Sequence, residues 1–178
     1  SSGNYPIGVV SDWKGAIVTA VGSHFGPIPH QRCLSHVLRL AKKLLPQNSP
    51  FEATLKLREI ALDLKNVSND LQKKVWVEKI VQWEKQYSSL LKEKTAGLPG
   101  GKKKWWDTHG NLRRGYRLLT YNQKPLFVYL GNPLIPKSNN SLEGVNSQMD
   151  KSLTNHRGMK IGQQISFVFW FCRKNVFR

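Results

Sequence analysis

The chain has 178 residues, with 28 Lys and Arg against 11 Asp and Glu, so its formal net charge is +17. This length supports a hydrophobic core, and the charge indicates a polyanionic partner, with nucleic acid the first candidate. The composition excludes a membrane span, because the most apolar run, Ile165–Cys172, is far shorter than the roughly 20 residues required. Two cysteines make no disulfide framework, and the start shows no signal-peptide pattern, so we expect a reducing cytoplasm.

The first quarter of the chain predicts two short strands, each followed by a helix. Apolar runs bounded by polar or turn residues indicate the strands, and helical periodicity indicates the helices. In chain order the expected elements are a strand at Pro6–Val10, a helix at Trp13–Val21, a strand at His30–Cys33 and a helix at Leu34–Leu45.

The middle of the chain predicts mainly helices. Ser49, Pro50 and Glu52 are typical of a helix start, with Ser49 as the cap. Further on, apolar side chains recur at helical spacing, which we interpret as core packing. They are Trp76, Ile80, Trp83, Tyr87 and Leu90.

The last third predicts a basic helix, a short apolar strand and two final helices. The basic helix covers Asn111–Leu119, and Leu126–Leu130 resembles a strand or an extended apolar segment. An amphipathic helix begins near Asn140. The final helix, about residues 160–175, is apolar almost all round, so we expect it to be covered.

Two carboxylates have both a structural and a chemical interpretation. Asp12 follows a predicted strand, where α/β folds place ligand-binding groups, but it could equally cap the next helix. Glu143 lies three residues after Asn140, the spacing of a capping box. If the two converge, their oxygens form a hard site for Mg²⁺ or Mn²⁺.

Cys33 and His36 form a Cys-x-x-His pair at a strand-to-helix junction. A zinc site needs about four ligands, and no second pair with suitable spacing is present. We therefore favour a structural cysteine beside a hydrogen-bonded histidine. A Cys–His nucleophile pair suits so basic a chain poorly.

Two basic segments are candidates for DNA contact. The first interleaves cations with Trp105, Trp106 and Tyr116, which suits phosphate contact and base stacking, or else a solvated basic face with the tryptophans packed inside. The second follows the Glu143 helix. The candidate DNA-binding residues are Lys102, Lys103, Lys104, Arg113, Arg114, Arg117, His156, Arg157 and Lys160.

Five blocks occur here in the order found in bacterial insertion-sequence transposases. They are VVSDWKG, PHQRCLSH, WWDTHGNLRRGYRLL, NNSLEGVNSQM and HRGM. The chain thus resembles the Mutator-like group of DDE transposases from Val9 to about Arg173. The resemblance implies an α/β fold with a ribonuclease-H-like core and a large helical insertion, mostly α in this chain. Its parts would be core strands in 1–36, the insertion in 37–137, and the glutamate helix and final helix in 138–178.

The resemblance also implies an activity. Such enzymes use two aspartates and one glutamate to bind Mg²⁺ or Mn²⁺, cut transposon ends and join them to target double-stranded DNA. Asp12 matches the second aspartate, Glu143 matches the glutamate, and Cys33 and His36 match the Cys-x-x-His signature. A homodimer or larger assembly, associated with the nucleoid, is expected.

The chain departs from the group at two places. Trp13 follows Asp12 where many relatives have Gly, and residues 1–11 offer no first aspartate. We therefore expect the C-terminal part of a transposase, nearly inactive alone. The alternatives are a non-catalytic basic DNA-binding module, including a decayed transposase, and a small module stabilised by zinc at Cys33 and His36.

Overall fold

The computed structural model describes residues 6–97 and 104–175. The chain forms two compact units, Ser1–Ser138 and Asn139–Arg178. Helices account for 66% of the structure and strands for 7%, so the mostly helical class with small sheets is as expected. Within residues 6–97 and 104–175, no helix combines the length and the apolar character needed to cross a membrane.

The first unit begins with a β–α–β segment. Strands β1 (Val9–Ser11) and β2 (His30–Arg32) are parallel, and helix α1 (Gly15–Phe25) connects them. This order matches the sequence prediction, although α1 starts two residues later and extends further than expected. Parallel strands require such a crossover, because a tight turn can only join antiparallel strands.

The outer edge of β2 is covered by a polar side chain and two short helices. Gln31 is fully buried, and its amide nitrogen donates to the Leu126 carbonyl at 3.2 Å, while its amide oxygen accepts from the Tyr129 N–H at 3.1 Å. These partners belong to the 3₁₀ helix η2 (Lys124–Leu126) and to α6 (Val128–Gly131). The strand predicted at Leu126–Leu130 is therefore wrong, because this apolar run folds into helical turns that close the edge of β2.

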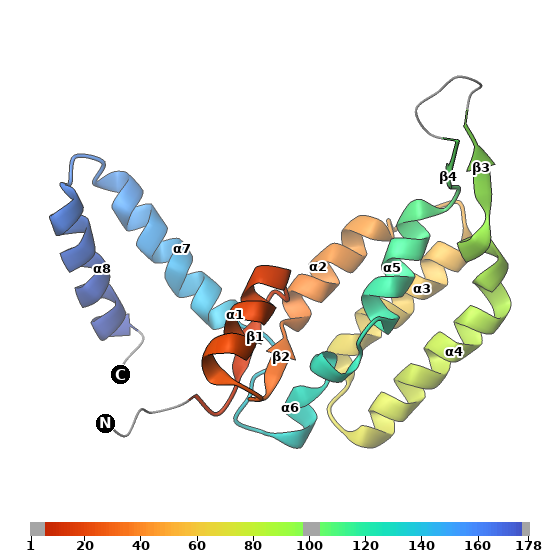
Figure 1. The fold of residues 1–178 in the computed structure, drawn as a ribbon, viewed down its shortest axis with the longest axis horizontal. Coiled ribbons are helices and arrows are strands. Elements are labelled where there is room, and N and C mark those ends of the chain that lie inside the picture. The colour runs from red at the N-terminus through yellow and green to blue at the C-terminus, as the bar shows by residue number, and fades with distance from the viewer. Residues whose placement is uncertain (1–5, 98–103, 176–178) are drawn as a thin grey trace. The chain divides into compact units, whose positions relative to one another are not determined.

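Five helical elements enclose the main core of the first unit. They are α2 (Leu34–Leu44), α3 (Glu52–Asp63), η1 (Leu64–Asn66), α4 (Asp70–Lys92) and α5 (Gly110–Thr120), shown in Figure 1. The predicted aromatic stripe of α4 is confirmed as core. Trp76 and Trp83 are buried, and their indole N–H groups donate to the carbonyls of Ile60 at 2.7 Å and Ala53 at 2.8 Å.

Helix α3 starts later than the sequence suggested. Glu52 is its first residue and Phe51 its cap, whereas the Ser49 hydroxyl accepts from the Phe51 N–H at 3.2 Å. Ser49 therefore closes the turn before the helix and is not the N-cap. Helix α5 packs closely on the end of α2, since a Cβ at Gly115 would lie 2.8 Å from Leu45 Cδ2.

A two-stranded ribbon follows α4. Strands β3 (Lys94–Ala96) and β4 (Trp105–Asp107) are antiparallel, and in Figure 1 they project from one end of the helical block. This ribbon is not predicted by the sequence pattern. Each strand has only three residues, too few to show an alternating pattern.

The second unit consists of two helices, α7 (Asn140–Asn155) and α8 (Ile161–Asn175), as the periodicity predicted. The expectation that α8 is covered is not met by the described residues. Four of its large apolar side chains are exposed, and so is Leu142 of α7. The exposed positions of α8 are Ile161, Ile165, Phe169 and Trp170.

Candidate functional site

Asp12 lies one residue beyond β1, at its carboxyl end, the position where α/β folds place ligand-binding groups. Its Oδ1 accepts from the backbone N–H of Lys14 at 3.2 Å, and its Oδ2 lies 3.0 Å from Lys14 Nζ. Helix α1 begins at Gly15 with Lys14 as its cap residue. The alternative that Asp12 is the helix cap is therefore wrong, because Lys14 holds the cap position and the Asp12 carboxylate bonds Lys14 itself.

A pocket of about 300 Å³ opens beside Asp12, within the first unit. The end of β1, strand β2 and one face of α2 supply its lining, in which Asp12 is the single acidic residue. The cations around it form a site suited to phosphate groups. The lining residues are Asp12, Lys14, Arg32, His36, Val37, Arg39, Leu40 and Lys43.

The charges around the pocket keep Asp12 ionised. Desolvation raises the pKa of Asp12, but the hydrogen bonds from the Lys14 side chain and backbone, with the charges of Lys14 and His36, outweigh it. The pKa of Asp12 therefore lies below its usual value. Arg32 donates to the Leu118 carbonyl at 3.3 Å, and burial lowers its pKa, yet a guanidinium keeps its proton at neutral pH.

Ser11, Trp13 and His30 support the Asp12 loop through contacts with one another, and of these only Trp13 was noticed in the sequence. The Ser11 hydroxyl is 2.8 Å from His30 Nε2 and also accepts from the Trp13 N–H at 3.2 Å. The rings of Trp13 and His30 are 4.6 Å apart between centroids. Burial lowers the pKa of His30, which favours the neutral ring and lets Nε2 accept the Ser11 hydrogen.

Trp13 has a backbone conformation that L-residues rarely adopt. Its φ is 64°, in the left-handed region where glycine is favoured. The one sequence feature that indicated this loop is Trp13 itself, which stands where many members of the group that the chain resembles have Gly. The conformation turns the chain sharply after Asp12, so that the carboxylate faces the pocket.

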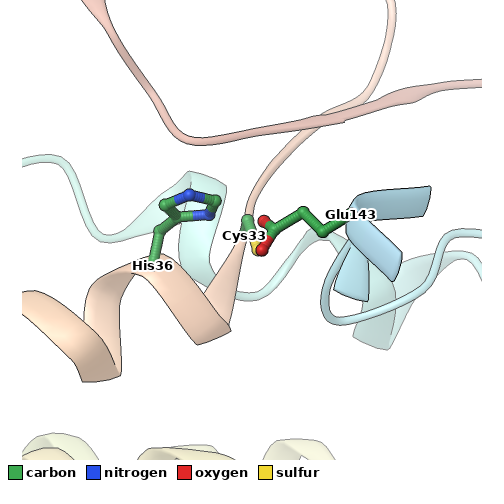
Figure 2. Close-up of side chains that lie close together, drawn as sticks. All are labelled: Cys33, His36 and Glu143. Atoms are coloured by element: carbon green, nitrogen blue, oxygen red, sulfur yellow. The ribbon is translucent and has the colours of Figure 1, made fainter. Parts of the chain in front are cut away.

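Cys33 and His36 lie at the start of α2, as Figure 2 shows. Cys33 is fully buried, and its N–H donates to the Ser11 carbonyl at 2.7 Å, which joins the end of β1 to α2. The Cys33 sulfur and a ring nitrogen of His36 lie within 4.8 Å of each other. Two ligands are half of a structural zinc site, so within the first unit's described residues this pair is not a complete one.

Glu143 lies in the first turn of α7 (Figure 2). Asn140 is the first helical residue and Asn139 occupies the cap position, with no cap hydrogen bond from its side chain. Glu143 is therefore the fourth helical residue, one beyond the position that a capping box uses. The capping box is wrong, and the pairing of Glu143 with Asp12 across the two units stays a prediction.

The predicted DNA-binding residues occupy several surfaces. In the first unit, Lys104, Arg114 and Arg117 are exposed, whereas Arg113 donates to Asp107 at 2.6 Å. His156, Arg157 and Lys160 are exposed in the second unit, where α7 ends and α8 begins. Lys102 and Lys103 lie outside the described residues.

The aromatic residues among them divide into two kinds. Tyr116 stacks on Trp83, with centroids 5.5 Å apart and planes 22° apart, so it belongs to the core and not to a stacking surface. Trp105 and Trp106 are exposed on the ribbon, so the alternative that they are packed inside is wrong.

No protein-family model, no curated protein and no solved structure matches the chain.

Proposed function

We propose that the chain is the C-terminal part of a DDE transposase catalytic domain, which cuts and joins DNA strands with divalent metal ions. In this proposal β1, α1 and β2 belong to a ribonuclease-H-like core, the helical block is its insertion, and α7 carries the catalytic glutamate. The order of the five sequence blocks supports it, and so does the β–α–β segment, whose first strand leads into Asp12.

One observation carries the proposal: an ionised aspartate at the end of a parallel strand, in a pocket otherwise lined by cationic and apolar side chains. A DNA-processing site needs both parts. The carboxylate holds metal ions, and the cations hold the phosphates of the strand that reacts. Lys14, Arg39 and Lys43 are the residues we assign to phosphate contact.

The donor set fits magnesium or manganese. Carboxylate oxygens are the ligands these hard ions prefer, and Asp12 is held ionised by the groups around it. Asp12 and Glu143 would hold the metal, and Lys14 would then exchange its contact with Oδ2 for one with phosphate. When bound, such ions activate the attacking oxygen and stabilise the leaving oxygen.

Ion binding and DNA binding test the proposal separately. Mn²⁺ binding, measured by calorimetry, is expected to weaken at least tenfold in Asp12→Asn and in Glu143→Gln. Binding of a fluorescent DNA duplex is expected to remain within about threefold. Asp63→Asn and Asp150→Asn are matched controls, since each removes an acidic group from the same unit as its counterpart. Equal Mn²⁺ binding by all five proteins would overturn the metal assignment.

Strand joining gives a third readout in a protein that carries all three carboxylates. There, Glu143→Gln is expected to abolish Mg²⁺-dependent cleavage and joining while DNA binding persists. Unchanged joining would remove Glu143 from the site.

The cations of the pocket have their own test. Lys43→Ala is expected to weaken duplex binding and to reduce the slope of log affinity against log salt by about one. Lys74→Ala, on an exposed part of α4, is the matched control and is expected to leave the slope unchanged. An unchanged slope in Lys43→Ala would place the DNA elsewhere.

A non-catalytic DNA-binding module is the second candidate. It is favoured by the Lys14–Asp12 ion pair and by the fact that Asp12 is the single acidic residue among those lining the pocket. It predicts salt-dependent DNA binding with no Mn²⁺ binding above that of Asp12→Asn.

A further inference from the structure

The β3–β4 ribbon has two tryptophans, one on each face. In its register Thr95 pairs with Trp106 and Ala96 pairs with Trp105. Successive side chains of a strand point to opposite faces, so the two adjacent indoles lie on opposite sides of the ribbon. Trp105 is 58% exposed and Trp106 is 44% exposed.

The two indoles of the ribbon bury less apolar surface than the tryptophans of the helical block. Burying a tryptophan side chain removes roughly 150–250 Å² of its surface from water. An isolated two-stranded hairpin is only marginally stable. The other tryptophans of the helical block, Trp76 and Trp83, are 2% and 3% exposed. Core packing therefore does not explain why the ribbon has two tryptophans.

The base of the ribbon is fixed by polar contacts instead. The Asp107 carboxylate binds both Lys94 of the neighbouring strand and Arg113 of α5. Glu93 pairs with His109 at 3.0 Å, and the His109 ring meets Phe51 edge to face at 5.0 Å. These contacts hold the ribbon on the helical block and leave the indoles outside it.

The surroundings of the indoles are cationic. Lys94 Nζ lies 4.1 Å from the centroid of the Trp105 ring, a cation–π contact. Lys104 and Lys92 are exposed near the two ends of the ribbon. Exposed aromatic rings beside cations suit a ligand that has flat apolar faces and negative charge, which describes unpaired nucleotides better than a protein surface.

We propose that the β3–β4 ribbon binds unpaired bases of DNA, one stacked on Trp105 and one on Trp106, with Lys94 and Lys104 at the adjoining phosphates. The inference rests on the proposed function, because it takes DNA as the ligand. It adds that this surface distinguishes opened from fully paired DNA. In duplex DNA the bases stack on each other, so their faces are not available to the indoles.

The test compares two DNA probes of equal length, a fully paired duplex and the same duplex with a central stretch of unpaired thymines. Fluorescence anisotropy at a fixed salt concentration gives both affinities for the whole chain. The wild-type protein is expected to prefer the opened probe. Trp105→Ala and Trp106→Ala are each expected to weaken binding of the opened probe about 5- to 150-fold, the range for the loss of one stacked base.

Trp170→Ala is the matched control. Trp170 is 61% exposed and also has a cation beside its ring, Arg173 at 5.3 Å, but it lies in α8 and not in the ribbon. Binding of both probes is expected to stay within about twofold of wild type. Trp105→Leu and Trp106→Leu, which keep an apolar side chain without a stacking face, are expected to behave like the alanine variants.

The outcomes separate this inference from the proposed function. Duplex binding without preference for the opened probe, or equal losses on both probes in the ribbon variants, would overturn the inference and leave the proposed function standing. No salt-dependent binding of either probe would overturn both. Unfolding temperatures within about 2 °C of wild type establish that the variants are folded; a larger drop with the preference intact would assign the indoles to stability and overturn the inference.

Discussion

The helical block and the β1–β2 corner are stabilised in different ways. The block is held by apolar side chains of α2 to α5, with each buried indole N–H bonded to a backbone carbonyl. The corner has strands of three residues, and polar side chains hold it: Gln31 on one side, and Ser11 with His30 on the other. The block is a scaffold, and the candidate site lies on the part that depends on hydrogen bonds.

The difference has a consequence for the effect of mutations. Apolar contacts are numerous and non-directional, so the neighbouring side chains of a core can repack and compensate for part of a lost contact. Buried hydrogen bonds are few, and removing one partner leaves the other unsatisfied. Four measurements test this difference between the block and the corner.

Trp76→Ala is expected to have the largest effect, because it creates a cavity in the block and removes the donor to the Ile60 carbonyl. The free energy of unfolding should fall by about 3–5 kcal/mol, measured by urea denaturation. Val75→Ala is the control, since Val75 is its exposed neighbour on α4, and its effect should stay within about 0.5 kcal/mol. Similar losses in both variants would contradict the assignment of Trp76 to the core.

Gln31→Leu keeps the size of the side chain but removes both hydrogen bonds to the edge of the corner. The buried Leu126 carbonyl and Tyr129 N–H would lose their partner, so the free energy of unfolding should fall by about 2–3 kcal/mol. Gln86→Leu, at an exposed position on α4, is the control. If Gln31→Leu is neutral or stabilising, the corner is held by packing and the comparison fails.

Trp13→Gly and Trp13→Ala together measure the backbone strain beside Asp12. Both remove the ring that packs on His30, but alanine keeps the cost of a positive φ and glycine does not. We expect the glycine variant to be the more stable by about 1 kcal/mol in thermal unfolding. Equal stability would mean that the loop relaxes once the ring is gone.

Mild acid is expected to have the smallest effect, and it should act on the corner. The pKa of His30 is lowered in the fold by burial, so the unfolded chain binds its proton more readily. The contribution of neutral His30 is present above its ordinary pKa of about 6.5 and is lost as the pH falls below that value.

Urea denaturation at a series of pH values measures this effect. The decrease in the free energy of unfolding at acid pH should be smaller in His30→Gln. It should persist in His24→Gln, since His24 is exposed on α1. An unchanged profile in His30→Gln would assign the acid sensitivity to another group.

The two regions also differ in how well the sequence predicts them. Trp76, Ile80 and Trp83 recur at helical spacing, so the face that α4 buries could be predicted from local pattern alone. The partners of Gln31 lie 95 and 98 residues away, and no local pattern indicates them. The prediction of a strand or extended segment at Leu126–Leu130 is wrong for a different reason, since an apolar run of this length fits a strand or a short helix.

The candidate site was predictable in part. The position of Asp12 after a strand indicated a ligand-binding group, but Lys14, Arg39 and Lys43 of its pocket were not among the residues predicted to bind DNA. The loop geometry was not predictable, because φ of Trp13 and the Ser11–His30 hydrogen bond depend on residues brought together by folding. The ribbon was missed because its strands are too short to show a pattern.

The contact between Gln31 and Leu126 sets an order for folding. It closes a loop of 95 residues, whereas the Trp76 indole bonds a carbonyl only 16 residues away. Loop-closure entropy makes the longer closure costlier by about 1.5 kcal/mol, so the helices should pair before the edge of β2 is sealed. In native-state hydrogen exchange the amides of β2 would then open before those of α4.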